Sequence, residues 1–480
     1  MQPSTVLAAA LVAFFGLSPA LALPPDVDTR NVIKRDVAII GGGSSGTNAA
    51  ILLKDAGKSV IVIEAKTIPG GHTHTYTDPA TGLTTDNGVN IWHNNTLVNQ
   101  YFRRFNIPLA PGVTTAGSNM FVDFKSGAIL NITVQQGSQQ AFGQALQKYA
   151  TFLSKYPQLA AGMFLPRPVP EELAMPFGQL VQQLGIEAAI PLFTRLNTGI
   201  GNPMTIPVVE FARVLGLPLI QQIGGPGFVT TARRNNSELY LKAGAELAES
   251  NSIWLSSRVV ASERKQSGVE LVVQTPEGIK YVCAKKLLIS IPPRLENLKE
   301  FNPTQAERNV FSKWLNAGYY SLILKNSGLP DLEVDNINPN SPLGIPDLPA
   351  AIFAGPSGIP GHTTFFYQIE RSTAAYAYTD DQIKAFIIAD LKRLQTVNRA
   401  NANFTQTQPE VIVTNSHVPF YLQVSSQDIL DGFYDRMNAL QGQFSTFYTG
   451  AAWRGQDSSI LWEYNKSVLL PLLLKSLEEA

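Results

Sequence analysis

Cysteine is almost absent from this chain of 480 residues, which contains only Cys283. A disulfide within the chain is therefore excluded, and stability must come from the large apolar core that a chain of this length can bury. Net charge is absent as well, because 37 Lys and Arg residues balance 37 Asp and Glu residues. Nucleic acids and anionic membranes attract basic proteins, so this balance argues against nucleic acid as a partner.

The sequence also lacks an apolar run long enough to span a bilayer comfortably. The run Val6–Leu17 is short and precedes the small-residue pattern Ala20–Ala22, which is typical of a secretory signal peptide even without Lys or Arg ahead of it. We therefore expect a signal peptide over 1–22 and a secreted, lumenal or vesicular location. The segment VLLPLLLKSL is apolar but contains Pro471, which favours a packed last helix and leaves membrane association open.

Two further features agree with passage through the secretory pathway. The dibasic pair Lys34-Arg35 follows an extended spacer and predicts cleavage of a propeptide over 23–35. In the alternative interpretation, the two charges only solvate the end of a strand. Asn-x-Ser/Thr sequons predict N-glycosylation at five positions, namely Asn94, Asn131, Asn235, Asn403 and Asn465.

The segment Asp36–Ala65 has the order expected of a nucleotide-binding βαβ unit: an apolar strand, a glycine turn, a helix and a second apolar strand. Its turn is G-x-G-x-x-G. Gly41 lets the chain turn tightly, Gly43 lets the backbone approach a pyrophosphate, and Gly46 lets the helix pack on the strand. A G-x-G-x-x-G alone is weak evidence, but here it lies directly between a strand and a helix, which predicts a dinucleotide site.

Polar groups stand where such a ligand needs them. The free N–H groups of Ser44, Ser45 and Gly46 begin the helix and face the phosphates, with the helix dipole behind them. Glu64 ends the second strand, where its carboxylate can accept both ribose hydroxyls. No second G-x-G-x-x-G follows a strand, so the sequence gives no indication of a separate NADPH site. If the dinucleotide takes up electrons, we expect them to leave to dioxygen or another acceptor.

The pattern of apolar residues changes in later parts of the sequence. Amphipathic or buried helices interrupted by Pro and Gly are predicted from about 135 to 222, and strands with two hairpin turns return before residue 293. At 480 residues, two intimately joined domains are the default. We expect an α/β protein with a Rossmann-type nucleotide domain in three segments and an inserted α+β substrate domain. The nucleotide domain takes 36–105, 240–297 and 410–480, and the substrate domain takes 106–239 and 298–409.

Motifs beyond the first turn carry a family resemblance. Pro69-Gly70-Gly71 follows the acidic residue after a short loop, Asp86-x-Gly88 comes next, and LLISIPP and YTGA stand further along. With these the sequence resembles the flavin amine oxidase and phytoene desaturase superfamily. Its DVAIIGGGSSG and GGHT segments are most similar to fungal FAD-dependent oxidoreductases of the β-cyclopiazonate dehydrogenase type.

The resemblance implies that the dinucleotide is FAD. A cysteine-linked flavin would depend on Cys283, whose surroundings KYVCAKKLLIS indicate a buried strand, so we expect no covalent link. In the family, the Gly-Gly pair lets backbone pass close to the phosphate and the flavin ring, and the last motif faces the flavin carbonyls. A histidine follows the Gly-Gly pair here, where amine oxidases usually have Arg. The further implied cofactor contacts are Gly70, Gly71, His72, Val259, Gly450 and Ala451.

Candidate reacting groups are few, because hydride removal by a flavin mainly requires an oriented substrate and exclusion of water. Tyr319, Tyr320 and Trp453 could form an aromatic wall beside the ring, although for any one of them a place in the core is the more common outcome. His417 could act as a general base, or could be a satisfied buried histidine. The remaining histidines have no thiol or carboxylate partners that would indicate a metal site.

Together these features predict an FAD-dependent oxidoreductase of fungal secondary metabolism. It would remove hydride from an apolar small molecule, with an internal nucleophile then closing a ring. The first alternative is a secreted amine or amino-acid oxidase that produces hydrogen peroxide. The second, of another class, is a flavin-binding protein without turnover.

Overall fold

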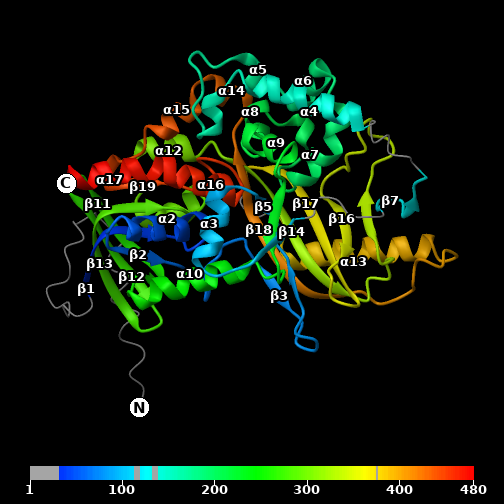
Figure 1. Cartoon of the computed structure of the whole chain (residues 1–480), viewed down its shortest axis with the longest axis horizontal. Coiled ribbons are helices and arrows are strands. Elements are labelled where there is room, and N and C mark those ends of the chain that lie inside the picture. Colours follow the sequence, from blue (N-terminus) through cyan, green and yellow to red (C-terminus); the bar gives the residue numbers. More distant parts are fainter. Residues whose placement is uncertain (1–31, 113–118, 132–138, 375–376, 480) are drawn as a thin grey trace.

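The computed structural model describes residues 32–112, 119–131, 139–374 and 377–479. The expected signal peptide over 1–22 and most of the expected propeptide lie outside the described residues. Within them the chain forms two large sheets that lie side by side along the long axis of the molecule (Figure 1).

The first sheet is the predicted nucleotide-binding half. Buried apolar residues fill its two central strands, as expected for parallel strands covered on both faces. Its parallel strands, in spatial order, are β10 (Ile253–Trp254), β2 (Val60–Ile63), β1 (Val32–Ile40), β13 (Gly278–Ile289) and β19 (Thr446–Tyr448). The antiparallel strands β12 (Gly268–Thr275) and β11 (Arg258–Lys265) extend it through the two predicted hairpins.

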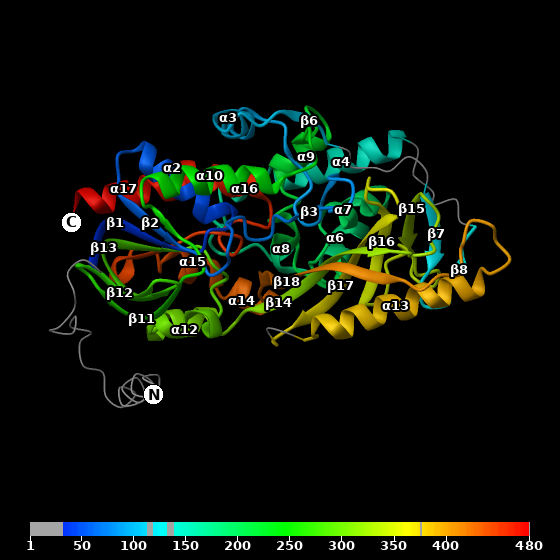
Figure 2. The same ribbon diagram turned by 90° about the horizontal axis from the view of Figure 1, so that it is seen from below.

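Helices drawn from the start, middle and end of the chain pack together on this sheet (Figure 2). They are α2 (Ser44–Asp55), α10 (Ser237–Glu249), α16 (Ser458–Tyr464) and α17 (Leu470–Glu478). The first helix ends just before Gly57, whose φ of +75° is one that glycine adopts readily. Segments from the start, the middle and the end of the chain therefore meet in this one unit.

The second sheet belongs to the substrate half. Its strands, in spatial order, are β18 (Glu410–Gln423), β14 (Leu315–Lys325), β17 (His362–Ser372), β16 (Ala350–Pro356), β15 (Glu333–Asn336), β7 (Asn119–Asp123) and β8 (Ala128–Ile129). One face packs on α13 (Asp380–Val397), which contributes four buried Ile and Leu residues to a separate core. The other face, including Phe366 and Phe420, joins the main core.

The predicted helical insertion covers that other face, on the side of the sheet opposite α13 (Figures 1 and 2). Its α-helices are α4 (Gln139–Leu153), α5 (Glu171–Ala174), α6 (Phe177–Leu184), α7 (Ile190–Leu196), α8 (Val208–Ala212) and α9 (Leu217–Ile223). Phe177 and Phe211 stack 3.7 Å apart inside it, so the insertion has its own aromatic centre.

Short elements connect the two halves. The first is a hairpin of β3 (Thr75–Thr77) and β4 (Thr84–Asp86). The second is a small sheet in the order β5 (Trp92–His93), β9 (Phe228–Thr231) and β6 (Leu109–Pro111). The remaining α-helices are α3 (Thr96–Arg104), α11 (Leu295–Leu298), α12 (Gln305–Phe311), α14 (Ser426–Leu430) and α15 (Phe433–Asn438). No helix in the described ranges is long and apolar enough to cross a membrane.

One domain boundary predicted from the sequence is wrong. Residues 410–423 were expected in the nucleotide domain, but they form β18, which pairs with β14 along the edge of the second sheet. The chain re-enters the nucleotide domain only with β19 (Thr446–Tyr448). The error arises because an apolar strand does not reveal in its own sequence which sheet it joins.

The dibasic pair does not precede the first strand but lies inside it. Lys34 and Arg35 pair in register with Cys283 and Ala284 of β13. The Arg35 side chain also donates to the carbonyl oxygens of Val60 and Asn251, each at 3.1 Å. Cleavage after Arg35 would remove these bonds, so the structure favours a structural role for the pair.

A chain that begins at Asp36 should consequently be less stable than one that begins at Val32. The shorter chain loses the pairing of 32–35 with 281–284 and the Arg35 bonds, which together should cost at least about 1 kcal/mol. Melting temperatures of the two purified chains measure the difference. Equal melting temperatures would show that cleavage after Arg35 leaves the fold intact.

Candidate active site

A cavity of about 840 Å³ extends from the glycine turn of the nucleotide domain into the second sheet. Its walls include the first turn of α2, the loop that carries the Gly-Gly pair, the loop after β19, α7 and strands β14 to β18. Its volume lies in the range of ligand and cofactor sites. Residues from both halves therefore face one continuous space.

The glycine turn leaves a cradle for an anion at the nucleotide end. Gly43 precedes the first helical residue and has no side chain to cap it, and the first backbone bond of the helix is from Thr47 N–H to Gly43 O. The N–H groups of Ser44, Ser45 and Gly46 are thus left without partners inside the helix. Because a helix N-terminus attracts negative charge, this end suits a diphosphate.

The Gly-Gly pair closes the cradle from the other side. Gly70 N–H donates to Gly42 O at 2.8 Å, and Gly43 and Gly70 form an isolated β-bridge. A Cβ on Gly71 would lie 3.0 Å from the Cα of Gly43, and one on Gly46 would lie 2.0 Å from Gly41 O. Glycine at these positions is therefore required by backbone contact.

Glu64 lies at the end of β2, as the sequence predicts, and its carboxylate is held by backbone. Oε2 accepts from Gly42 N–H at 2.6 Å, and Oε1 accepts from Lys66 N–H at 2.7 Å. Each oxygen keeps a lone pair for a further donor, such as a ribose hydroxyl. Glu64 lines the cavity, so this geometry supports the predicted ribose contact.

The loop after β19 forms the opposite wall. Gly450, with a φ of +100°, and Ala451 line the cavity directly before the turn into α16. Asp457 caps α16 by accepting from the backbone N–H groups of Ser459 and Ile460. The Asp457 Oδ2 atom lies 3.0 Å from His93 Nε2. Burial opposes ionisation of this carboxyl, but the neighbouring His93 and the bonds from the helix bring its pKa down to about 2.

The far half of the cavity is mainly apolar. Phe366 and Phe420 project from β17 and β18, and the insertion contributes Leu196 and Leu219. A polar group interrupts this surface where Arg195 of α7 forms a two-bond ion pair with Glu333 of β15 and lies over the ring of Phe353. The shape suits a largely apolar molecule with one polar end.

Two of the predicted reacting groups come together at the junction of the halves. Tyr319 lines the cavity, and its ring stacks on that of His417 with the centroids 4.2 Å apart and the planes at 6°. His72 also lines the cavity and meets His417 edge-on at 4.6 Å. His417 itself is fully buried behind them, with Nε2 at 3.3 Å from Ser321 Oγ.

These imidazoles are neutral at ordinary pH. Burial lowers the pKa of His72 to about 3 and that of His74 to about 4, and the nearby Lys66 ammonium adds to both effects. Burial and the neighbouring His72 hold the pKa of His417 well below its usual value. Each neutral ring has a free lone pair, but the lowered pKa makes it a weak base, and His417 does not itself reach the cavity.

The other aromatic candidates lie elsewhere. Trp453 stacks on Tyr448 at 4.9 Å and is packed against Phe311 in the core, outside the described residues that line the cavity. Its prediction as a reacting residue is therefore wrong. Tyr320 points to the other face of β14, where it belongs to the core shared with α13 and donates to Tyr378 O.

Val259 is also absent from the described lining of the cavity. It lies in β11 opposite Val273, two residues after Ser257, whose N–H donates to Glu64 O. The strand thus starts near the carboxylate expected to bind the ribose. Val259 itself does not line the cavity, so its position does not provide the cofactor contact that the family resemblance implies.

Two of the predicted glycosylation sites conflict with the fold. Asn465 is fully buried, and its amide donates to Ser45 O and Asn48 Oδ1. Asn235 stands at the start of α10, and its sequon continues into the buried Ser237. Asn131 and Asn403 are exposed and Asn94 is partly exposed, so these three stay predictions.

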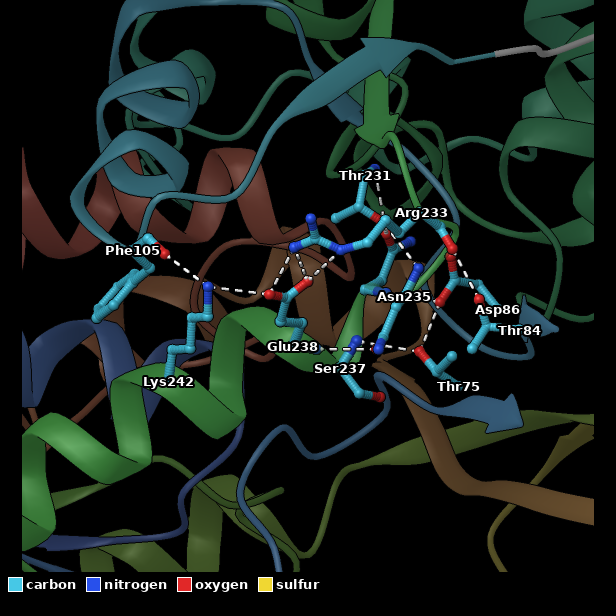
Figure 3. Close-up of polar contacts among 11 residues, drawn as sticks. Thr75, Thr84, Asp86, Phe105, Thr231, Arg233, Asn235, Ser237, Glu238 and Lys242 are labelled. Carbon is cyan, nitrogen blue, oxygen red and sulfur yellow. Dashed lines mark hydrogen bonds and ion pairs between the residues drawn. The ribbon is translucent and has the colours of Figure 1, made fainter. Parts of the chain in front are cut away.

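Asp86 is a cavity residue that the sequence analysis noted only as part of a motif. Figure 3 shows it at the end of β4, beside the start of α10, where its Oδ1 accepts from Thr75 Oγ1 at 2.6 Å and from Asn236 N–H at 2.8 Å. Burial raises the pKa of Asp86 to about 6, against these two bonds and the nearby Arg234. A desolvated carboxylate on a cavity wall is a common property of functional sites.

The comparisons with known proteins agree with this geometry. Residues 39–105 match the NAD(P)-binding Rossmann-like domain family. The chain is 42% identical to the FAD-dependent oxidoreductase oblC of Cochliobolus heterostrophus, over 94% of this chain and 93% of that protein. It is 32% identical to β-cyclopiazonate dehydrogenase of Aspergillus oryzae, over 96% of this chain and 99% of that protein.

The chain belongs to the fungal FAD-dependent oxidoreductases. Solved structures show the same fold at low identity. A fatty acid isomerase from P. acnes matches with a TM-score of 0.71 and 18% identity, over 91% of this chain and 98% of that one. Putrescine oxidase matches with a TM-score of 0.64 and 15% identity, over 92% of this chain and all of that one. The predicted amine-oxidase-like architecture is confirmed.

The residues present fit FAD. The unpaired N–H groups of α2 meet the diphosphate's charge, the Gly43–Gly71 crossing leaves room for it, and Glu64 offers lone pairs to a ribose. The cavity then continues past Gly450 toward Tyr319, which gives the flavin end an apolar and aromatic setting.

Replacing Glu64 with Gln should weaken FAD binding by tenfold or more. One amide N–H₂ would then face either Gly42 N–H or Lys66 N–H, and loss of a bond to a charged group costs about 1.5–3 kcal/mol. Titration of the apoprotein with FAD, followed by flavin fluorescence, measures the change. Glu249→Gln, on the exposed end of α10, is the matched control and should bind like wild type.

Asp86→Asn should stabilise the protein increasingly as pH rises from about 4 to about 6. The pKa of Asp86 is about 6 in the folded protein and 3.8 in the unfolded chain. As pH rises through this range the unfolded chain releases its proton more easily than the folded protein, so the free energy of unfolding of wild type falls. Asn keeps an acceptor for Thr75 and Asn236 but does not ionise. Melting temperatures of both proteins across this range give the test.

The control for this titration is Asp36→Asn. Hydrogen bonds with Lys285 and Ser59 hold the pKa of Asp36 at about 2, so its contribution is constant over the same range. That variant should lose a fixed amount of stability at each pH. A melting-temperature difference for Asp86→Asn that does not change with pH would contradict the raised pKa.

Proposed function

We propose that this enzyme dehydrogenates an apolar small molecule of fungal secondary metabolism by hydride transfer to non-covalently bound FAD, with ring closure following in the same cavity. The observation that carries the proposal is the continuity of one cavity from the Gly43–Gly71 cradle to the apolar surface around Phe366 and Phe420. A cofactor held at one end thus meets a substrate held at the other.

FAD, when bound, supplies the two-electron acceptor, and the chain's own residues supply position and a dry environment. Tyr319 and Phe420 present flat apolar surfaces at the junction, and their centroids lie 4.8 Å apart. Leu219 and Phe353 surround the rest of the substrate. Exclusion of water by these side chains protects a cationic or electron-poor product from hydrolysis until an internal nucleophile reacts.

A proton must leave the substrate as well as a hydride. His72 is the imidazole on the cavity wall, and its contact with His417 gives the proton a second neutral ring to reach. The Nδ1 atom of His417 is buried without a hydrogen-bond partner among the described residues. His417 therefore acts, in this proposal, through His72 and not on the substrate directly.

The polar end of the substrate lies near Arg195 and Glu333, and electrons leave to dioxygen or another acceptor. Non-covalent binding is supported by the position of Cys283, which lies on β13 opposite Glu270 and Lys34. Passage through the secretory pathway is supported by the N-terminal apolar run and by the exposed sequons at Asn131 and Asn403.

Anaerobic reduction is the experiment that tests the function. The purified protein should be yellow and should lose its visible flavin bands when mixed with an apolar metabolite extract, with a dehydrogenated or cyclised product found by mass spectrometry. Polyamines and amino acids are the comparison set, with peroxide measured in air. Rapid bleaching by a polyamine or an amino acid, and none by the extract, would support an amine or amino-acid oxidase instead.

A further inference from the structure

A single π-helical turn, Asn465–Leu469, lies between α16 and α17. Such turns are rare, and they occur frequently at functional sites because the extra residue redirects a side chain. Here the first residue of the turn is Asn465, which is fully buried. Its amide points toward Ser45 and Thr449, behind the nucleotide end of the cavity, and not toward solvent.

The Asn465 amide uses its complete hydrogen-bonding capacity. Its Oδ1 accepts from Thr449 Oγ1 at 2.6 Å and from Ser45 Oγ at 3.3 Å. Its Nδ2 donates to Ser45 O at 2.9 Å and to Asn48 Oδ1 at 3.1 Å. The two hydroxyls also lie 2.9 Å from each other, so Ser45, Thr449 and Asn465 form a closed buried network.

Two partners of Asn465, Ser45 and Thr449, belong to the two walls of the cavity between which the nucleotide is expected to lie. Ser45 is in the first turn of α2, beside the unpaired N–H groups of the cradle, and Thr449 directly precedes Gly450. Both line the cavity. The Thr449 N–H is fixed in turn on Ile289 O of β13. Asn465 is thus a bridge between segments about 400 residues apart in sequence, on the side facing away from the ligand.

We infer that Asn465 is a positioning residue for FAD, which sets the separation between the start of α2 and the Thr449-Gly450 segment so that both fit one cofactor. The inference depends on FAD use, which the family membership gives, and not on the identity of the substrate. Asn465 touches neither the substrate nor the cavity; its effect passes through Ser45 and Thr449.

A purely structural amide would behave differently. It would lower the stability of the apoprotein and of the FAD complex equally, and it would leave the affinity for FAD unchanged. A positioning residue instead reduces the extra stability that FAD confers, because that gain follows the ratio of ligand concentration to Kd. The difference between the two melting temperatures therefore separates the two roles.

The experiment compares Asn465→Ala and Asn465→Asp with wild type, each with and without FAD. Both variants should bind FAD at least about tenfold more weakly, since each loses two or more buried hydrogen bonds that hold the cradle. The rise in melting temperature caused by FAD should shrink to match. Asp keeps the volume and the acceptor atoms, so it decides the question where the Ala variant fails to fold.

Thr449→Val gives an independent test from the other side of the network. It keeps the shape of the side chain and removes the 2.6 Å bond to Asn465 Oδ1. The loss of FAD affinity should be smaller than that for Asn465→Ala, and the double variant should lose less than the sum, because the two residues share one bond.

Asn336→Ala is the matched control. Asn336 is also a buried amide with two bonds to backbone, but it lies in the second sheet. Its Nδ2 donates to Ala351 O, and its Oδ1 accepts from Phe124 N–H. It should lower both melting temperatures equally and leave the Kd for FAD unchanged. The same pattern in both Asn465 variants would overturn the inference. Failure of wild type to bind FAD would instead overturn the proposed function.

Discussion

The close passage of two backbones without side chains, at Gly43 and Gly70–Gly71, is the constraint on which the rest of the site depends. The bond from Gly70 N–H to Gly42 O and the bridge between Gly43 and Gly70 hold the two segments so close that a Cβ on Gly71 would lie 3.0 Å from the Cα of Gly43. This contact keeps the start of α2 open to a ligand, and it brings His72 to the cavity wall. The cradle and the imidazole cluster are therefore consequences of the same crossing.

The site takes its second half from the way the domains are interleaved. The insertion and the second sheet bring apolar side chains to the end of the cavity that the nucleotide domain leaves open, and Gly199 of the insertion lies directly against Tyr319 and Phe420. The flavin end of the cavity is thus enclosed by elements of both halves. The cofactor contacts and the lining of the far half thus come from different segments of the chain.

Sequence reasoning succeeded where a short stretch of chain determines its own structure. The βαβ unit and the place of Glu64 follow from local turns and apolar runs, and the structure has them where expected. It failed where the outcome depends on distant partners. The aromatic Trp453 is core because Tyr448 and Phe311 surround it, and the polar Asn465 resembles a glycosylation site because its buried partners lie far away in sequence. Asp86 stood out in the sequence only as part of a motif. Its burial, which raises its pKa, depends on the packing of α10 and could not be predicted from that motif.

The nucleotide domain is built from the first and the last parts of the chain, since β1 and β19 flank the same strand, β13. A ribosome that has not yet released residues 446–478 therefore holds a polypeptide with an incomplete cofactor site. FAD loading must then be a post-translational event, carried out on a finished chain in whichever compartment it folds. Flavin must therefore be present in that compartment for the finished chain to become active.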